Sequence, residues 1–135
     1  MRNWICASPM LVVGLIVGLI AGLSATTASA QAGDAAKGER VFNMQCKACH
    51  TLERGGASVA GPNLHGLIGR KSGFGTNYSY SEAMRKFGIE WNDKTLAAYL
   101  RDPKADMPGT KMVYAGLKRQ DQLADLIAYL REATK

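Results

Sequence analysis

The sequence has few cysteines, few histidines and no apolar run long enough to cross a membrane. It contains three cysteines and two histidines among 135 residues, a length that allows one domain. One of the cysteines, Cys6, lies in an N-terminal segment that resembles a signal peptide. Only Cys46 and Cys49 then remain, and a bridge between them would be short and strained, which excludes a disulfide-rich scaffold. The two cysteines therefore need another use.

Residues 1–30 have the composition of a secretory signal peptide, with Arg2 as the only charged side chain. An apolar run of 14 residues follows from Met10 to Leu23, and Ala28-Ser29-Ala30 forms an A-x-A cleavage site. A membrane-spanning helix needs about 20 residues. We therefore predict that the signal is removed near Ala30 and that the chain is exported to the periplasm, with an uncleaved membrane anchor as the alternative.

Residues 31–135 would then form the functional domain, with 16 basic and 11 acidic side chains and a net charge of +5. The basic residues are dispersed along an exported chain, so binding to nucleic acid is not expected. The sequence gives no reason to expect a stable oligomer, and we predict a monomer.

The pattern after the signal predicts an all-α fold with several short helices and long loops. Residues 51–74 are rich in glycine, include Pro62 and have no sustained apolar period, so they are expected to form loops. A loop of this length needs something to wrap, and a flat, mostly apolar cofactor would supply it. Four segments have helical caps or helical apolar spacing: 34–46, 79–87, 92–102 and 118–133.

Local signals give these helices detail. Ser79 to Glu82 fits an S-x-x-E capping box, which would make Ser79 an N-cap, and Gly88 is expected to end that helix. Asn92 can cap the next helix, and Pro103 is expected to end it. Gly38 weakens the first helix and therefore indicates a close approach by another element. The last helix has apolar residues at i, i+3, i+4 and i+7: Leu123, Leu126, Ile127 and Leu130.

The segment Cys46-Lys47-Ala48-Cys49-His50 is a C-x-x-C-H motif, the attachment signature of c-type haem. Cysteines at i and i+3 lie on one face of a helical turn, where both can form thioether bonds to one haem edge, and His50 then becomes an axial iron ligand. A thioredoxin-like site would need a βαβ setting, which the pattern lacks. A zinc site with His65 does not have finger spacing, and a chance match leaves the loops unexplained.

Candidates for a second iron ligand are the methionines after the signal and His65, which lies in the glycine-rich loop. A methionine is more often core filler than a ligand. Met44 shares a helix with the motif and cannot reach the other haem face, and Met84 lies in a predicted helix. Met107 and Met112 flank a Pro-Gly loop suited to approach a haem, and chemistry alone does not choose between them.

Taken in order, these motifs resemble the class I cytochromes c, specifically the small soluble mitochondrial and alphaproteobacterial respiratory type. The resemblance covers nearly the whole mature chain and implies the cytochrome c fold, wrapped around one covalently bound haem within residues 31–135. It rests on five segments: CKACH at 46–50, GPNLHGL at 61–67, GRK at 69–71, PGTKM at 108–112 and DLIAYL at 125–130.

The resemblance also implies residue roles. Met112 becomes the second axial ligand, and the Pro62 carbonyl orients His50 through a hydrogen bond. Tethering of the haem propionates and hydrogen bonding around the methionine fall to five further residues: Arg70, Tyr80, Trp91, Tyr99 and Thr110. Packing of the first helix on the last falls to four: Gly38, Phe42, Leu126 and Tyr129.

Two departures from the family pattern stand out. Met84 replaces a common asparagine, which is expected to alter the hydrogen bonds near the haem and the redox potential. Gln45, Ala57 and Val59 replace lysines of the mitochondrial docking ring. The basic residues that remain for docking are Lys104, Lys111, Lys118 and Arg119.

The implied function is electron transfer and not catalysis. His/Met ligation fills both axial positions of the iron and favours a high potential. We predict a soluble shuttle from the quinol–cytochrome c oxidoreductase to a terminal cytochrome c oxidase, with a photosynthetic reaction centre or a periplasmic dehydrogenase as other partners. A peroxidase or gas sensor is the competing class, and it requires an open iron site.

Overall fold

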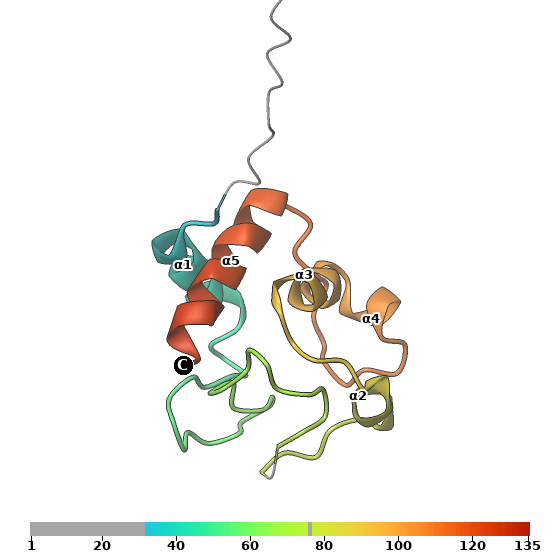
Figure 1. Ribbon diagram of the computed structural model, residues 1–135. Helices are drawn as coiled ribbons and strands as arrows, with labels where there is room; N and C mark the ends of the chain where they lie inside the picture. Colours follow the sequence, from blue (N-terminus) through green and yellow to red (C-terminus); the bar gives the residue numbers. More distant parts are fainter. Residues whose placement is uncertain (1–31, 76) are drawn as a thin grey trace, which may run out of the picture.

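The structure is a computed structural model that describes residues 32–75 and 77–135; the predicted signal peptide lies outside these ranges. Within the described part, the secondary structure is helical apart from one isolated bridge between Lys71 and Glu90. None of the described helices is long and apolar enough to span a bilayer. The all-α prediction is confirmed by five helices (Figure 1): α1 Ala35–Gln45, α2 Glu82–Phe87, α3 Asp93–Arg101, α4 Pro103–Asp106 and α5 Gln120–Ala133.

The first and last helices cross in close contact (Figure 1). A Cβ atom added to Gly38 would lie 1.9 Å from the carbonyl oxygen of Asp125 and 2.7 Å from the Cβ of Tyr129, so only glycine fits. The ring centroids of Phe42 and Tyr129 lie 5.6 Å apart. The backbone N–H of Asp34, which caps α1, donates to Asp125 Oδ1 at 2.7 Å. The predicted close approach at Gly38 is thus confirmed.

The capping box at Ser79 is wrong in its register. Ser81 is the N-cap of α2, and its hydroxyl accepts a hydrogen bond from the Met84 N–H at 3.1 Å. The cause is that Ser81 has extended backbone angles immediately before the first helical residue, which is the geometry an N-cap needs. The helix α2 ends at Gly88, whose left-handed φ of 68° is typical of a glycine C-cap.

The segment after α2 forms two helices where one was expected. Asn92 caps α3 in a reciprocal capping box with Thr95. Pro103 ends α3 as predicted, but it also starts the short helix α4, because proline is well suited to the first helical turn. Asp102 caps α4 by accepting from the Ala105 N–H. The last helix begins at Gln120, two residues later than expected.

The core lies where α1, α3 and α5 meet. The predicted apolar face of α5 is buried along its length, and α3 contributes a facing row. Several of these side chains also face the cavity described below, so the core packs around it: Leu96, Tyr99, Leu100, Leu126 and Leu130.

A Gly38→Ala substitution tests the helix contact by the sign of its effect. Helix propensity alone would raise the free energy of unfolding by about 1 kcal/mol. Overpacking against Asp125 and Tyr129 should instead lower it by about 1–3 kcal/mol. Chemical denaturation of the haem-loaded protein measures the change. The control is Asn43→Ala at an exposed position of α1, which should change the free energy of unfolding by no more than about 0.5 kcal/mol. A stabilised Gly38→Ala protein would contradict the packing.

Candidate functional site

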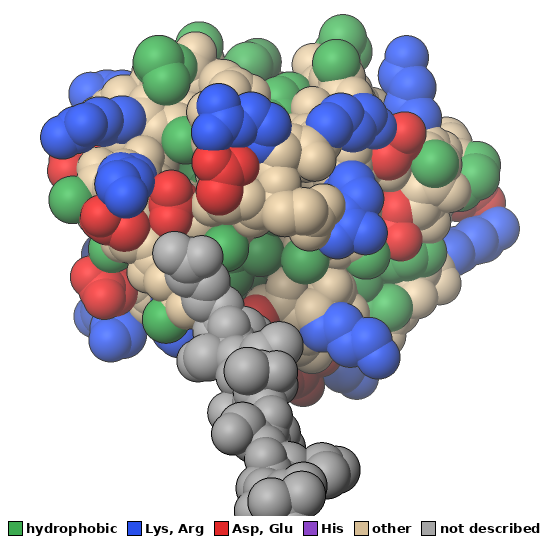
Figure 2. All heavy atoms as spheres, turned by 90° about the horizontal axis from the view of Figure 1, so that it is seen from above, with side chains coloured by type: hydrophobic (Ala, Val, Ile, Leu, Met, Phe, Trp, Pro, Cys, Tyr) green, Lys and Arg blue, Asp and Glu red, His purple; other side chains and the backbone are tan. Residues whose placement is uncertain are grey.

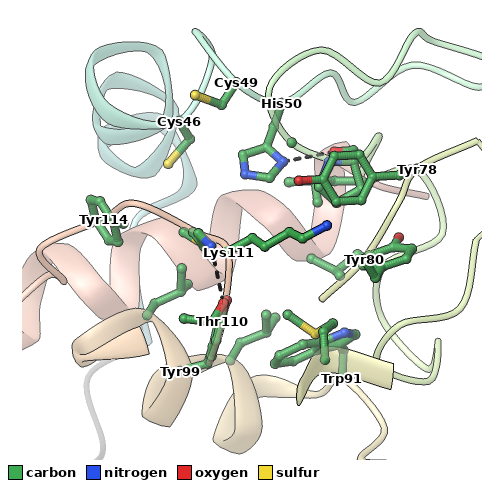
Figure 3. A pocket seen from close by; sticks show the side chains of 18 of the residues that line it. Cys46, Cys49, His50, Tyr78, Tyr80, Trp91, Tyr99, Thr110, Lys111 and Tyr114 are labelled. Atoms are coloured by element: carbon green, nitrogen blue, oxygen red, sulfur yellow. Dashed lines mark hydrogen bonds between the residues drawn. The ribbon is translucent and has the colours of Figure 1, made fainter. Parts of the chain in front are cut away.

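A cavity of about 240 Å³ lies between the helices and the loops (Figure 3). Its walls combine apolar side chains from α3 and α5 with polar groups from the connecting segments. Those segments are the turn after α1, the loops between α1 and α2, and the loop after α4. A mostly apolar cavity with a few convergent polar groups is typical of a cofactor site.

The C-x-x-C-H segment forms one wall. The helix α1 ends at Gln45, and the chain continues through a further turn in which the N–H groups of Cys49 and His50 both donate to the Cys46 carbonyl at 3.0 Å. This turn keeps the two cysteines and the histidine together at one side of the pocket (Figure 3). The expected single-turn arrangement is therefore present.

The surroundings of Cys46 argue against a reactive redox thiolate. Burial, followed by the nearby Cys49, raises the pKa of Cys46 to about 11, so this thiol stays protonated at neutral pH. A reactive thiolate needs the opposite shift. Among the described residues, no group of three or more Cys, His, Asp or Glu side chains could hold a metal ion, which argues against zinc.

The ring of His50 is oriented by the backbone. The Nδ1 atom lies 2.8 Å from the Pro62 carbonyl oxygen, which can only accept, so Nδ1 carries the proton and Nε2 keeps its lone pair. Burial lowers the pKa of His50, against the opposing effect of the Pro62 hydrogen bond, and favours the neutral ring. A neutral imidazole with one oriented nitrogen is the form that ligates a metal.

The structure separates the candidate ligands that chemistry left open. Met112 is half-buried and lines the cavity, whereas Met107 is only 1% exposed and lies in the core outside the cavity walls. Met84 also lines the cavity. Met44 is 72% exposed, and His65 accepts a hydrogen bond from Arg54 near the surface.

The loop that carries Met112 is held through Thr110. The Thr110 Oγ1 lies 2.7 Å from the Tyr99 hydroxyl and accepts from the Met112 N–H at 3.3 Å. Figure 3 shows Thr110 and Tyr99 across the pocket from Cys49 and His50. The hydroxyl of one residue thus links the loop to α3 and to the backbone of Met112.

The three residues expected near the haem propionates also line the cavity. Arg70 donates to the carbonyl oxygens of Asn63 and His65, and its side chain lines the same cavity. Tyr80 and Trp91 lie there as well (Figure 3), and Trp91 packs against Tyr99 with ring centroids 5.3 Å apart. All ten residues that the sequence analysis assigned to haem attachment, iron ligation and the surrounding hydrogen bonds therefore line one cavity.

Comparisons with known proteins decide what this cavity holds. The cytochrome c family model matches residues 35–134. The chain is 50% identical over 109 residues to the cytochrome c of Chlamydomonas reinhardtii, which covers 81% of this chain and 97% of the relative. It is 55% identical over 102 residues to the cytochrome c of Theileria annulata, covering 76% and 88%.

The chain belongs to the cytochrome c family. It therefore carries one haem c, attached covalently through Cys46 and Cys49, and it transfers electrons and is not an enzyme. The cavity fits this group, because its walls are mainly apolar, two thiols lie on one turn, and His50 presents a free Nε2.

Sequence reasoning gave no role to several residues that shape this cytochrome c pocket. Gly61 is one, because a Cβ atom there would lie 2.4 Å from His50 Cε1. Asn63 is another, since its amide donates to the Thr51 hydroxyl and the Glu53 carbonyl and so holds the loop together. These contacts join residues ten or more positions apart, so no local sequence pattern predicts them.

A double-mutant cycle tests the link between Tyr99 and Thr110. Thr110→Val should cost about 1–3 kcal/mol of unfolding free energy, because it leaves the buried Tyr99 hydroxyl without its partner. Tyr99→Phe in the same protein should recover part of that cost, since the unpaired hydroxyl is gone. Denaturant unfolding of the four proteins gives the coupling, and strictly additive costs would show that the two hydroxyls act independently.

Proposed function

We propose that this cytochrome c is a soluble periplasmic electron carrier that runs between a quinol–cytochrome c oxidoreductase and a terminal cytochrome c oxidase. The observation that supports it is the pocket itself, which has His50 on one wall and Met112 among its other lining residues. If His50 and Met112 both held the iron, no position would be open to a substrate, which would suit a carrier and not a peroxidase or gas sensor.

When bound, haem c supplies a one-electron Fe(II)/Fe(III) couple. The residues of the pocket set its properties in three ways. Met112 offers a soft sulfur ligand that favours Fe(II), and the apolar walls disfavour the extra charge of Fe(III), so both raise the potential. The Pro62 carbonyl orients the His50 ring. Because His50 and Met112 both line the cavity, little would have to move during transfer.

Arg70, Tyr80 and Trp91 are assigned to the propionate end. Arg70 is a charged group whose hydrogen bonds go to backbone carbonyls, so its positive charge remains available to a propionate. The Tyr80 hydroxyl lies 3.5 Å from the Phe74 carbonyl, a long contact that leaves it able to donate elsewhere.

The periplasmic location rests on the leader pattern of residues 1–30, which precedes the family match at 35–134. Mass measurement of the exported protein should give a chain that begins near Gln31 and carries one haem. A full-length chain retained in the membrane fraction would instead identify residues 1–30 as an anchor.

The four basic residues predicted for docking differ in their surroundings. Lys118 donates to Asp102 at 2.9 Å, and Arg119 pairs with Asp121, so both charges are offset locally. Basic and acidic side chains are interleaved on the face shown in Figure 2. Lys104 is exposed, and Lys111 lines the cavity, where its Nζ donates to the Ser79 carbonyl at 3.0 Å. We therefore place the docking charge mainly at Lys104 and Lys111.

Two methionine variants test the ligand assignment. Met112→Ala should abolish the weak red ferric absorption band of methionine–iron ligation and lower the redox potential, because the soft sulfur is lost. Met107→Ala is the matched control, which should keep the band while losing about 2–5 kcal/mol of unfolding free energy. A wild-type protein with a high-spin ferric iron and no such band would contradict the carrier proposal and favour an enzyme or a sensor.

A charge reversal tests docking. Lys111→Glu should slow oxidation by the terminal oxidase about two- to fivefold at low salt, and less at high salt, because steering is screened. Lys135→Glu makes the same charge change at the exposed chain end, outside the cavity walls, and should have little effect. Lys111→Gln separates loss of the charge from its reversal. Equal rates for the two Glu variants would remove Lys111 from the docking face.

A further inference from the structure

The loop that carries Met112 is tied down at its ends by backbone hydrogen bonds, and exposed residues alternate with half-buried ones between them. At its start the Thr110 N–H donates to the Met107 carbonyl at 3.1 Å, and at its end the Leu117 N–H donates to the Leu100 carbonyl at 2.8 Å. Val113, next to Met112, is 94% exposed. Gly116 packs closely on the backbone of Arg101, where an added Cβ atom would lie 2.2 Å from the carbonyl oxygen. Residues 113–115 therefore depend most on a side-chain contact to hold them against the body of the protein.

Tyr114 makes that contact. Its hydroxyl donates to Gln45 Oε1 at 2.7 Å, across a sequence separation of 69 residues. Among the described residues, this is the one side-chain hydrogen bond that leaves the stretch 113–116 for another element. The Tyr114 ring is half-buried and packs against the core, so it enters the hydrogen bond already restrained.

The acceptor, Gln45, lies next to the haem-attachment turn. Gln45 is the last residue of α1 and directly precedes Cys46, which anchors the haem. Both Gln45 and Tyr114 line the cavity, and Tyr114 lies on the side of the pocket near Cys46 (Figure 3). Lys111 reaches in the opposite direction to Ser79 and holds the loop at the other side. The loop is thus held on both sides of Met112.

We propose that Tyr114 and Gln45 form a clasp that keeps the Met112 loop closed over the cavity, which makes Tyr114 a positioning residue for the iron ligand. The inference rests on the proposed function, in which Met112 is that ligand. It adds a residue pair that controls how often the ligand loop opens. A small molecule that binds iron reports this opening, because it competes with Met112 only when the loop has moved away.

The test measures the rate at which imidazole binds to the ferric, haem-loaded protein. Tyr114→Phe keeps the packed ring and removes only the hydroxyl, and Gln45→Met keeps the side-chain length without the acceptor. Each should speed imidazole binding about two- to tenfold, the population shift expected for one lost hydrogen bond. The double variant should be no faster than either single one, and Gln45→Glu, which keeps an acceptor, should be close to wild type.

Tyr129→Phe is the matched control, since it removes a tyrosine hydroxyl from α5 outside the cavity walls and should leave the rate unchanged. Equal rates for wild type and Tyr114→Phe, with the methionine–iron band intact, would overturn the clasp alone. Additive increases in the double variant would also overturn it, because the two residues would then act separately. A wild type without the band would overturn the His50/Met112 site and the clasp together.

Discussion

The position of the haem-attachment turn depends on the close packing of α1 against α5. At Gly38 the backbone of one helix meets the Asp125 carbonyl and Tyr129 of the other, with no room for a side chain. Asp34 strengthens the same crossing by capping α1 and donating to Asp125. Because Cys46 follows α1 without a break, the crossing places both cysteines and His50 beside the cavity. A shift of α1 against α5 would therefore move the wall of the cavity that Cys46, Cys49 and His50 form.

Around that wall, the polar groups of the pocket are oriented largely by backbone carbonyls and hydroxyls. His50 uses the Pro62 carbonyl, Arg70 uses two loop carbonyls, and Tyr99 uses the Thr110 hydroxyl. Buried polar groups are costly unless they are paired, so these bonds stabilise the loops as well as the site. The long glycine-rich loop therefore has a definite conformation although it has little regular secondary structure.

The charge of this cytochrome c is also shaped by local pairing. The net positive charge is spread over the chain, and Lys118 and Arg119 are each offset by a neighbouring carboxylate. Gln45 stands where the mitochondrial pattern has a lysine, and in this protein it accepts a hydrogen bond from Tyr114. In the proposed clasp, this position holds the Met112 loop instead of carrying a charge.

The sequence by itself determined the features that local rules control. The C-x-x-C-H motif, the apolar face of α5, the Asn92 cap and the stops at Gly88 and Pro103 all involve residues within a few positions of one another. The order of the motifs carried the resemblance to the family. Where two local rules competed, as for Ser79 and Ser81, the sequence pattern chose the wrong cap, since both serines precede the same helix.

The tertiary structure decided what depends on long-range contact. It placed Met112 on the cavity and Met107 in the core, although both flank the same Pro-Gly loop. It paired Tyr114 with Gln45 and Lys118 with Asp102, and it brought Gly61 against the His50 ring. The physical reason is that a side chain's burial and partners are set by packing between segments far apart in the chain, which no spacing rule encodes.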